Sequence, residues 1–407
     1  MADQFTRVTT ESWGKRLTGA LGGIGGGFVL VIAAIGALAW NEGRAVTTAR
    51  ALTEGAGAVV SIGAEGTVPG PDGAPLDTTG MLVHVTGTLV TPPPVPLRDE
   101  LFGLPDATPD NAVRLERVVE MYQWKESSKS ETRTKLGGGT ETVTSYSYSK
   151  DWSGSEISSG NFADPTGHQN PPLPLKGDSF SEDRVIEAGG LQRSLDAGFV
   201  SRIGKTEALA LSEGEVARIA AALGAPGRGR LAQGGAYIGY DPTRPQVGDL
   251  RISYRVARAD SASVVARDTG TGFAPWTSSN GREIYMIREG AVPAAAMFDE
   301  AQKQNTLLTW GLRIGGFLAM LAGFKAIFAI FGVIADVLPV AGSLVRAGTG
   351  LIALVLTLVI APLTIGIAWL AVRPLLGGAI IGIGLALAVG FFVLARRKAA
   401  AVPAAAA

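Results

Sequence analysis

Histidine is the side chain best suited to move protons near neutral pH, and this chain of 407 residues has only two. His168 lies in the turn-forming string at 167–171, with Asp164 and Asn170 close to it in sequence. A histidine placed this way could act as a general base if a nucleophile or a bound water lay within hydrogen-bond reach. It could also stabilise the turn through a side-chain hydrogen bond to the backbone, which is the role we expect.

No other pattern in the sequence supports catalysis. His84 falls in the middle of an expected strand, and one histidine alone makes no zinc site. The chain has no cysteine, which excludes zinc–thiolate sites and thiol nucleophiles. It has no Gly-x-Ser-x-Gly elbow, Walker loop or His-Glu-x-x-His motif, and its glycines at 23 and 25 lie in an apolar run rather than after a strand. The sequence therefore predicts no metal, no cofactor and no enzyme activity.

Two cations, Arg313 and Lys325, interrupt a long apolar run in the last third of the chain. Charges within a membrane span often mark the path of an ion or a substrate, so they favour a transporter or channel subunit as one alternative. Only eleven uncharged residues separate them, too few to cross a hydrocarbon core of ~30 Å. Because no acidic residue lies within the spans, we expect the two long side chains to reach opposite membrane interfaces.

Aromatic residues gather in two stretches of alternating residues, 113–126 and 142–152. Tyrosine and tryptophan dominate interface hot spots, so an exposed cluster would form a partner-binding surface. The same side chains also pack well in a half-buried sheet, and the sequence leaves both interpretations open. The candidate interaction or structural residues are Tyr122, Trp124, Tyr146, Tyr148 and Trp152, together with His168 and Arg313.

The chain that holds these residues carries its long apolar runs at its two ends. Residues 20–40 form an uncharged run of about 21 residues, long enough to cross a membrane as a helix. This run exceeds the usual ~7–15 residues of a signal-peptide core, so we expect a retained helix rather than a cleaved leader. Three further transmembrane helices are expected at 307–331, 348–372 and 375–395.

Charged residues near the helix ends assign the two sides of the membrane. The basic residues at positions 15, 16, 325, 346 and 396–398 all fall on one side, which the positive-inside rule makes cytoplasmic. The tryptophans at 40, 310 and 369 then lie at the opposite interface, which indole rings favour. The sequence thus predicts cytoplasmic segments at 1–19, 332–347 and 396–407, the last a disordered tail, and an extracytoplasmic domain at 41–306.

Residues 41–306 are mixed and polar, with short period-two alternations typical of strands. Three glycines at 137–139 separate the two longest alternations and predict a hairpin. Helices are expected at 207–223, with a capping motif at 212–215, and at 292–304, running directly into the second span. The predicted fold class is a membrane protein with four transmembrane helices, one plus three, and a large β-rich α+β extracytoplasmic domain between the first and second. Further strands are expected at 82–90, 236–240, 249–256, 262–267 and 283–288.

Charge and glycine spacing indicate the kinds of partner. The formal net charge is zero and the sequence pI is about 6.8, so the basic surface that nucleic acid binding requires is missing. Glycines at spacing four in the first span, such as Gly23 and Gly27, let helices approach closely in lipid. We therefore expect membrane lipids, further copies of this chain and unidentified proteins as partners, and no nucleic acid.

Six strings follow one another along the chain: Asn-Glu-Gly-Arg-Ala at 41–45, Val-Glu-Met-Tyr-Gln-Trp at 119–124, Tyr-Ser-Tyr at 146–148 with Trp152, Gly-His-Gln-Asn-Pro at 167–171, Val-Gly-Asp-Leu-Arg at 247–251 and Trp-Gly-Leu-Arg at 310–313. Together they resemble the LUMA family, transmembrane protein 43. The resemblance implies four spans, cytoplasmic termini and no catalytic residue. For animal members it implies a self-associating scaffold of the endoplasmic reticulum and inner nuclear membrane that binds emerin and lamins.

The richness in glycine and alanine indicates a bacterial member of this family, located in the inner membrane, to which the animal partners do not carry over. The functional hypothesis is a multi-pass, oligomeric membrane scaffold that recruits proteins or organises the membrane through its extracytoplasmic domain. One alternative is a transporter or channel accessory subunit. Another is a membrane-tethered hydrolase built around His168.

Overall fold

The computed structural model describes residues 3–372 apart from 64, 71, 73 and 91–96, together with 375, 378, 379, 382 and 383. The chain divides into two compact units. The β-rich unit consists of residues 1–7, 51–130 and 144–300, and the helical unit of residues 8–50, 131–143 and 301–407. Within the described residues, three helices are long and apolar enough to cross a membrane, and in sequence one precedes and two follow the β-rich region. The predicted class, a membrane α+β protein, is confirmed.

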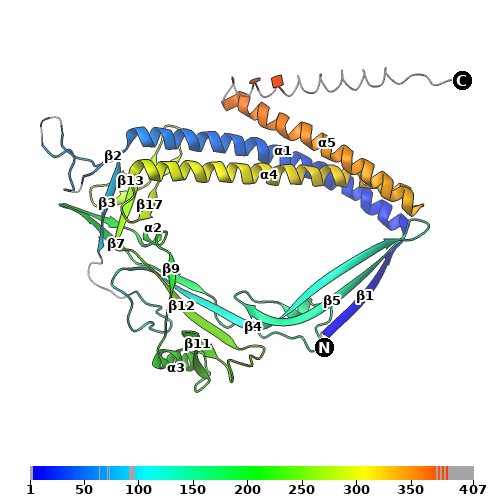
Figure 1. Cartoon of the computed structure of the whole chain (residues 1–407), viewed down its shortest axis with the longest axis horizontal. Helices are drawn as coiled ribbons and strands as arrows, with labels where there is room; N and C mark the ends of the chain where they lie inside the picture. The colour runs from blue at the N-terminus through cyan, green and yellow to red at the C-terminus, as the bar shows by residue number, and fades with distance from the viewer. Residues whose placement is uncertain are drawn as a thin grey trace. The chain divides into compact units, whose positions relative to one another are not determined.

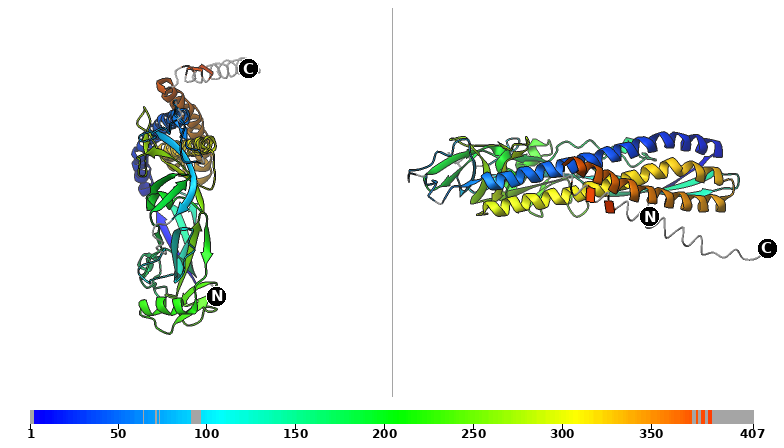
Figure 2. Two further views of the ribbon diagram at one scale, coloured as in Figure 1. Left: turned by 90° about the vertical axis from the view of Figure 1, so that its left-hand side faces the viewer. Right: turned by 90° about the horizontal axis from the view of Figure 1, so that it is seen from above.

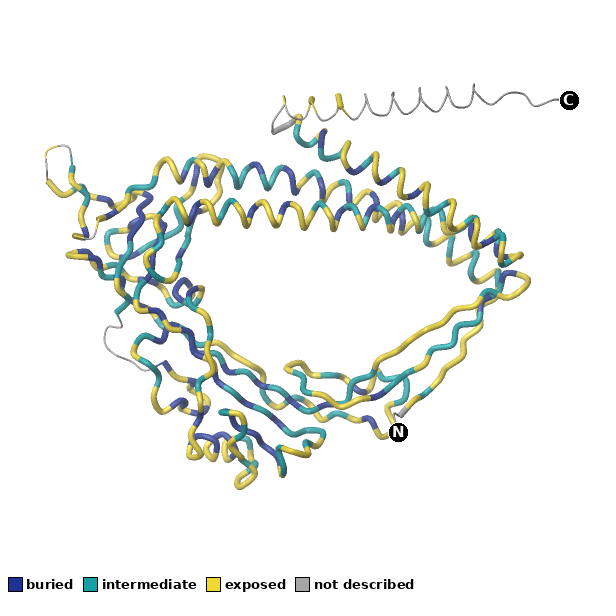
Figure 3. The backbone as a smooth tube through the Cα atoms, viewed as in Figure 1, coloured by how far each residue is buried: buried dark blue, intermediate teal, exposed yellow. Residues whose placement is uncertain are grey.

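Three long helices carry the apolar runs: α1 (Trp13–Ala58), α4 (Ala294–Ala335) and α5 (Pro339–Val372). The 46 residues of α1 correspond to about 69 Å, more than twice a hydrocarbon core of ~30 Å. Many large apolar side chains of these helices are exposed, as expected for helices that face lipid (Figure 3). The fourth expected helix, 375–395, lies for the most part outside the described residues.

α1 and α4 lie side by side in the helical unit (Figures 1 and 2). Glycines allow this approach: a Cβ atom on Gly27 would come within 2.7 Å of the Gly323 carbonyl oxygen, and one on Gly323 within 2.9 Å of the Gly27 carbonyl oxygen. Leu38 of α1 and Met320 of α4 are buried in the same apolar cluster. For Gly27 the predicted role in close helix packing is confirmed.

The turn between α4 and α5 is short. Residues 332–347 were expected to link two spans on the cytoplasmic side, and most of them are helical, since α4 ends at Ala335 and α5 begins at Pro339. Proline suits the first turn of a helix because its fixed φ matches helical geometry and its missing N–H has no partner there. The helix expected at 292–304 does continue into α4, which begins at Ala294. The membrane boundaries themselves stay predictions.

Two sheets organise the strands. One has eight strands, on the path β1-β5-β4-β12-β11-β10 with β6 beside β4 and β9 beside β12. Its strands are β1 (Asp3–Glu11), β4 (Ala112–Thr134), β5 (Thr140–Ser153), β6 (Asp178–Phe180), β9 (Thr206–Leu209), β10 (Gly229–Ala232), β11 (Gly235–Ile238) and β12 (Leu250–Arg258).

The second sheet has seven strands, on the path β14-β13-β3-β7-β8 with β17 beside β13 and β2 beside β3. A two-stranded ribbon, β15 and β16, and the short helices η1, α2 and α3 complete the β-rich unit. Their bounds are β2 (Val60–Ser61), β3 (Leu82–Val90), β7 (Arg184–Ala188), β8 (Leu191–Leu195), β13 (Ser261–Asp268), β14 (Phe273–Ala274), β15 (Trp276–Thr277), β16 (Glu283–Ile284), β17 (Met286–Glu289), η1 (Ser159–Asn161), α2 (Ala197–Val200) and α3 (Glu213–Ala222).

Strand register creates one apolar core on each sheet. Antiparallel pairing sets Ile252 of β12 opposite Val119 of β4, and both side chains are buried in a core that also contains Ile219 of α3. The second core gathers Val264 of β13 and Ile186 of β7 with other buried residues. In both sheets the alternation of apolar residues along the strand decides which face is buried.

Most of the predicted strands are confirmed, and β3 covers 82–90 as expected. The helix predicted at 207–223 is wrong at its start, because residues 206–209 form β9 and pair with β12. The helix begins at Glu213, after a capping box in which Ser212 and Glu215 bond each other's backbone N–H. Hydrogen bonding to a neighbouring strand therefore outweighs helix propensity at 207–209.

Candidate functional site

His168 is enclosed by aromatic rings. It is 3% exposed, its ring stacks on Tyr148 with centroids 3.9 Å apart, and it meets Trp124 edge-on at 4.7 Å. Its Nδ1 lies 3.0 Å from the carbonyl oxygen of Asp164, which is the turn-stabilising bond that the sequence predicted. Burial, and then its hydrogen bond to Glu126, raises the pKa of the Tyr148 hydroxyl. These neighbours give His168 a packing role within an aromatic cluster.

The other aromatic candidates also make contacts within the β-rich unit. Tyr122 lies 5.2 Å from Trp152, Trp152 lies under the guanidinium of Arg251 at 3.9 Å, and Tyr146 lies 5.9 Å from Phe5 of β1. All three candidates are only partly buried. Packing explains these positions, and the alternative of a partner-binding surface stays a proposal.

Arg313 has an acidic partner that the sequence did not predict. Its Nε and Nη2 donate to the two carboxylate oxygens of Glu42 on α1, each at 2.7 Å. The indole Nε1 of Trp369 on α5 donates to Glu42 Oε2 at 2.5 Å. The side chains of Arg313 and Glu42 are 16% and 1% exposed. The acidic partner thus comes from a residue just beyond the first apolar run, and the expected position of Arg313 at the membrane interface stays a prediction.

The polar contacts continue one turn along α1 and α4. The Asn41 amide donates to the Thr309 carbonyl oxygen at 3.1 Å. Arg44 donates to the Asn305 side chain at 2.9 Å and to the Thr309 hydroxyl at 2.9 Å, and the Asn305 amide donates to the Ala45 carbonyl oxygen at 3.0 Å. We call Asn41, Glu42, Arg44, Asn305, Thr309, Arg313 and Trp369 the polar cluster. It joins all three long helices through side chains that are mostly buried.

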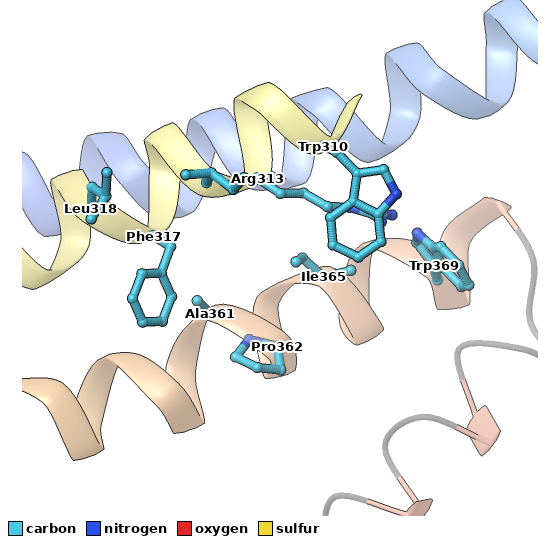
Figure 4. A pocket seen from close by; sticks show the side chains of 9 residues that line it. Trp310, Arg313, Phe317, Leu318, Ala361, Pro362, Ile365 and Trp369 are labelled. Atoms are coloured by element: carbon cyan, nitrogen blue, oxygen red, sulfur yellow. The ribbon is translucent and has the colours of Figure 1, made fainter. Parts of the chain in front are cut away.

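An apolar groove adjoins the polar cluster between α4 and α5 (Figure 4). Its volume is about 390 Å³. The Arg313 guanidinium lies at one end, over the rings of Trp310 at 4.7 Å and Trp369 at 5.7 Å. Figure 4 shows Phe317, Ile365 and Pro362 along the groove away from this end. The arrangement sets one cationic group at the mouth of an otherwise apolar space.

A second charge cluster lies at the other end of the long helices. Asp336, in the turn after α4, is fully buried and accepts from Arg16 at 2.6 Å and from Arg346 at 2.5 Å. The Trp13 indole donates to the Val333 carbonyl oxygen at 2.8 Å. Arg16 and Arg346 were both assigned to the cytoplasmic side, and this contact agrees with that assignment.

The tip of the β4–β5 hairpin also reaches this charge cluster. The Gly137 N–H donates to the Val337 carbonyl oxygen at 3.2 Å, and Arg16 donates to the carbonyl oxygen of Gly138. The sequence-based assignment puts the hairpin on one side of the membrane and Arg16 and Val337 on the other. A polar hairpin cannot pass through hydrocarbon, so this contact and that assignment exclude each other within one bilayer.

Among the residues that the structure describes, no group of three or more histidine, aspartate or glutamate side chains could hold a metal ion. The polar cluster contains one carboxylate and two guanidinium groups, and cations of this kind repel metal ions. What the cluster can do is bind helices to one another and present an N–H donor at the groove.

Comparison with known proteins places the chain in a family. A family model described as Transmembrane protein 43 matches residues 121–374, which is more than half of the chain. The chain belongs to the Transmembrane protein 43 family. Transmembrane protein 43 of Mus musculus is 31% identical over 387 residues, covering 91% of this chain and 90% of that protein. The Homo sapiens protein is 30% identical over 383 residues, with 91% and 90% covered.

A more distant member, the Transmembrane protein 43 homolog of Drosophila melanogaster, is 26% identical over 301 residues, covering 72% of this chain and 73% of that protein. No solved structure matches the chain. The resemblance to Transmembrane protein 43 is thus confirmed, and the bacterial origin stays a prediction.

The strings that carry the resemblance to Transmembrane protein 43 now have structural roles. The strings at 41–45 and 310–313 supply most of the polar cluster, including Glu42 and Arg313. The strings at 119–124 and 167–171 bond each other, because the Asn170 side chain bonds both the N–H and the carbonyl oxygen of Trp124. Sequence reasoning missed Glu42 and Asn305 as site residues. The signal available was a charged residue two positions past an uncharged run of about 21 residues, the length of one span.

Proposed function

We propose that the chain is an oligomeric membrane scaffold that recruits proteins or organises the membrane through its β-rich unit, and that it is not an enzyme. The observation that supports this proposal most is the polar cluster. Its charged and amide side chains bond one another across α1, α4 and α5. Groups used this way hold helices together and are not available to transform a substrate.

The aromatic cluster around His168 supports the same proposal. A general base needs access to the proton that it removes, whereas His168 is 3% exposed and stacked on Tyr148. Partial exposure of Tyr122 and Trp152 leaves amphipathic surface on the β-rich unit. Such side chains are typical anchors of protein interfaces.

Cross-linking in cells followed by mass spectrometry tests the scaffold proposal. The β-rich unit carries lysines at 125, 129 and 150 on strands β4 and β5. We expect reproducible cross-links from these lysines to a small set of proteins and to other copies of the chain. A variant with all three replaced by arginine is the matched control and should lose the links while keeping its membrane location. Recovery of the same proteins from the control, or of none from the native chain, would contradict the proposal.

The rival functions have their own tests. If the chain were a transporter or channel subunit, liposomes containing it would pass ions at a rate that falls with Arg313→Leu. Because Arg313 is held by Glu42, we expect no flux above empty liposomes for either protein. If it were a hydrolase, an activity of the purified chain would disappear with His168→Gln, and we expect no such activity.

We also propose the finer assignment of sides, with both termini cytoplasmic and residues 41–306 extracytoplasmic, on the basic residues near the helix ends. The contact between Gly137 and Val337 opposes this assignment, so the two make opposite predictions. The chain has no native cysteine, so pairs of introduced cysteines report on single contacts. The assignment expects that Gly138→Cys and Val337→Cys form no disulfide in sealed membranes, since a bilayer separates them. The pair Arg16→Cys and Asp336→Cys should cross-link under the same conditions. A disulfide between residues 138 and 337 would overturn the assignment.

A further inference from the structure

Arg313 has hydrogen-bonding capacity that its protein neighbours leave unused. A guanidinium group carries five N–H donors, and the two atoms Nε and Nη2 bond Glu42. None of the described residues accepts a hydrogen bond from Nη1, whose two N–H groups stay available at the groove end. An N–H donor next to hydrocarbon costs several kcal/mol when it has no acceptor. The groove therefore calls for an occupant that carries an acceptor at this end.

The dimensions of the groove indicate what kind of molecule that is. Its residues on α4 extend from Trp310 to Leu318, a rise of about 12 Å. One leaflet of the hydrocarbon core is about 15 Å thick. Trp310 and Trp369 at one end are the residue type that prefers the membrane interface, so the groove runs from the interface into one leaflet. This is the path of a lipid acyl chain.

We infer that the groove between α4 and α5 binds one glycerophospholipid, with an acyl chain along Phe317, Pro362 and Ile365 and its phosphate accepting hydrogen bonds from Nη1 of Arg313. Apart from Arg313, the groove is lined almost entirely by apolar side-chain surface. Phosphate is favoured at this donor because a guanidinium presents paired N–H groups in the geometry of phosphate oxygens. The ion pair with Glu42 and the flanking indoles hold the guanidinium in place before the lipid arrives.

A photoactivatable phosphatidylglycerol with a diazirine in its acyl chain tests the site. The full chain is reconstituted in phosphatidylethanolamine vesicles containing a small fraction of this probe, irradiated and digested. We expect adducts on the peptides that contain residues 310–318 and 361–369. Labelling of these peptides no greater than that of residues 348–358, which lie on α5 outside the groove, would overturn the inference.

Two isoleucine variants provide a matched pair. Ile365 lines the groove, whereas Ile367 is 55% exposed and does not. Ile365→Trp fills the groove and should reduce labelling at least about tenfold, while Ile367→Trp should leave it unchanged. Thermal unfolding of both variants shows whether each is folded. Equal labelling of the two folded variants contradicts the inference, as does a groove that stays unlabelled in the native chain.

The phosphate contact has a separate test. A diazirine diacylglycerol has the same acyl chains and no phosphate. We expect it to label the groove about tenfold less than phosphatidylglycerol, the equivalent of losing one charge-assisted hydrogen bond. In Arg313→Lys, the difference in labelling between the two probes should shrink. A single ammonium group that stays paired with Glu42 has no second set of N–H donors for phosphate. Equal labelling by both probes in the native chain overturns the assignment of phosphate to Arg313. Neither result bears on the scaffold proposal, which the cross-linking experiment tests separately.

Discussion

Each unit of the molecule buries a carboxylate that accepts from an arginine and from an aromatic side chain. In the β-rich unit, Asp99 accepts from Arg117 at 2.5 Å and from the Tyr254 hydroxyl at 2.6 Å. In the helical unit, Glu42 accepts from Arg313 and from the Trp369 indole. Both carboxylates are at most 1% exposed. The same chemistry thus neutralises a buried charge inside a sheet core and between helices.

The two sites differ in what remains if the carboxylate is lost. Arg117 also donates to the Lys176 carbonyl oxygen and lies 3.7 Å from Asp178, which is exposed to water. Arg313 bonds only Glu42 among the described residues. A charge near water has substitutes for its partner, and a charge between apolar helices has none. The helical site should therefore be the more sensitive of the two.

Removing Glu42 should have the largest effect. Glu42→Ala leaves Arg313 charged and unpaired between apolar helices, which costs about 3–5 kcal/mol of unfolding free energy. The measurement is denaturant unfolding of the chain in detergent. Combining Glu42→Ala with Arg313→Leu should recover part of the loss, because the isolated charge is gone. A double variant less stable than Glu42→Ala would show that the pair is not coupled in this way.

Removing Asp99 should cost less, which sharpens the comparison. We expect Asp99→Ala to lower the unfolding free energy by about 2–3 kcal/mol, since Arg117 keeps Asp178 and a backbone acceptor. The same unfolding assay applies. Its control is Asp72→Ala, an exposed carboxylate that among the described residues bonds only the Ala74 N–H. A loss larger than that of Glu42→Ala would reverse the proposed order of the two sites.

The helical site also depends on close packing of α1 against α4, which Gly27 allows. Gly27→Ala forces a Cβ against the Gly323 carbonyl oxygen at 2.7 Å, and we expect a loss of about 1–3 kcal/mol. Gly25→Ala is the matched control, because a Cβ there meets no atom within 4 Å. It should be neutral or slightly stabilising, as alanine is the better helix former. Equal effects of the two substitutions would mean that α1 and α4 do not pack through Gly27.

We expect the smallest change in unfolding free energy from removing the Tyr254 hydroxyl, which donates to Asp99 in the β-rich unit. Burial, and then the bond to Asp99, raises the pKa of Tyr254 well above its ordinary value. A raised pKa means that the folded chain keeps this proton when the unfolded chain has lost it, so stability is full below pH ~10 and falls as pH rises further. Tyr254→Phe should cost about 1 kcal/mol at neutral pH and flatten the alkaline decline. An unchanged decline, measured as unfolding free energy between pH 9 and 11, would contradict this role.

The sequence predicted the elements better than their contacts. Hydropathy located the three apolar helices, and alternation placed β3 at 82–90, because both patterns are local. The partner of Arg313 is 271 residues away, and no local pattern connects them. Glu42 was assigned to the soluble domain since it follows the apolar run, yet α1 continues without a break to Ala58. The start of α3 was missed for the same reason, because pairing with β12 decides it.

For His168 and the aromatic residues, the sequence limited the possible roles to two each but did not decide between them. A turn string next to an aspartate predicted the bond between His168 and the Asp164 carbonyl. Whether Tyr122 and Trp152 pack inward depended on the strand register, which a sequence alone does not give.

The polar cluster also limits how the helical unit responds to bilayers of different thickness. Asn41 and Arg44 follow directly on the apolar run of α1, and Asn305 lies just before the apolar run of α4. Sliding the helices deeper would desolvate these groups, and sliding them outward would expose leucine and valine to water. A mismatched bilayer must therefore be met by tilt or by local deformation of the lipid, each at a cost that grows with the mismatch. Placement of these few side chains thus gives the chain a physical basis for preferring one membrane over another by its thickness.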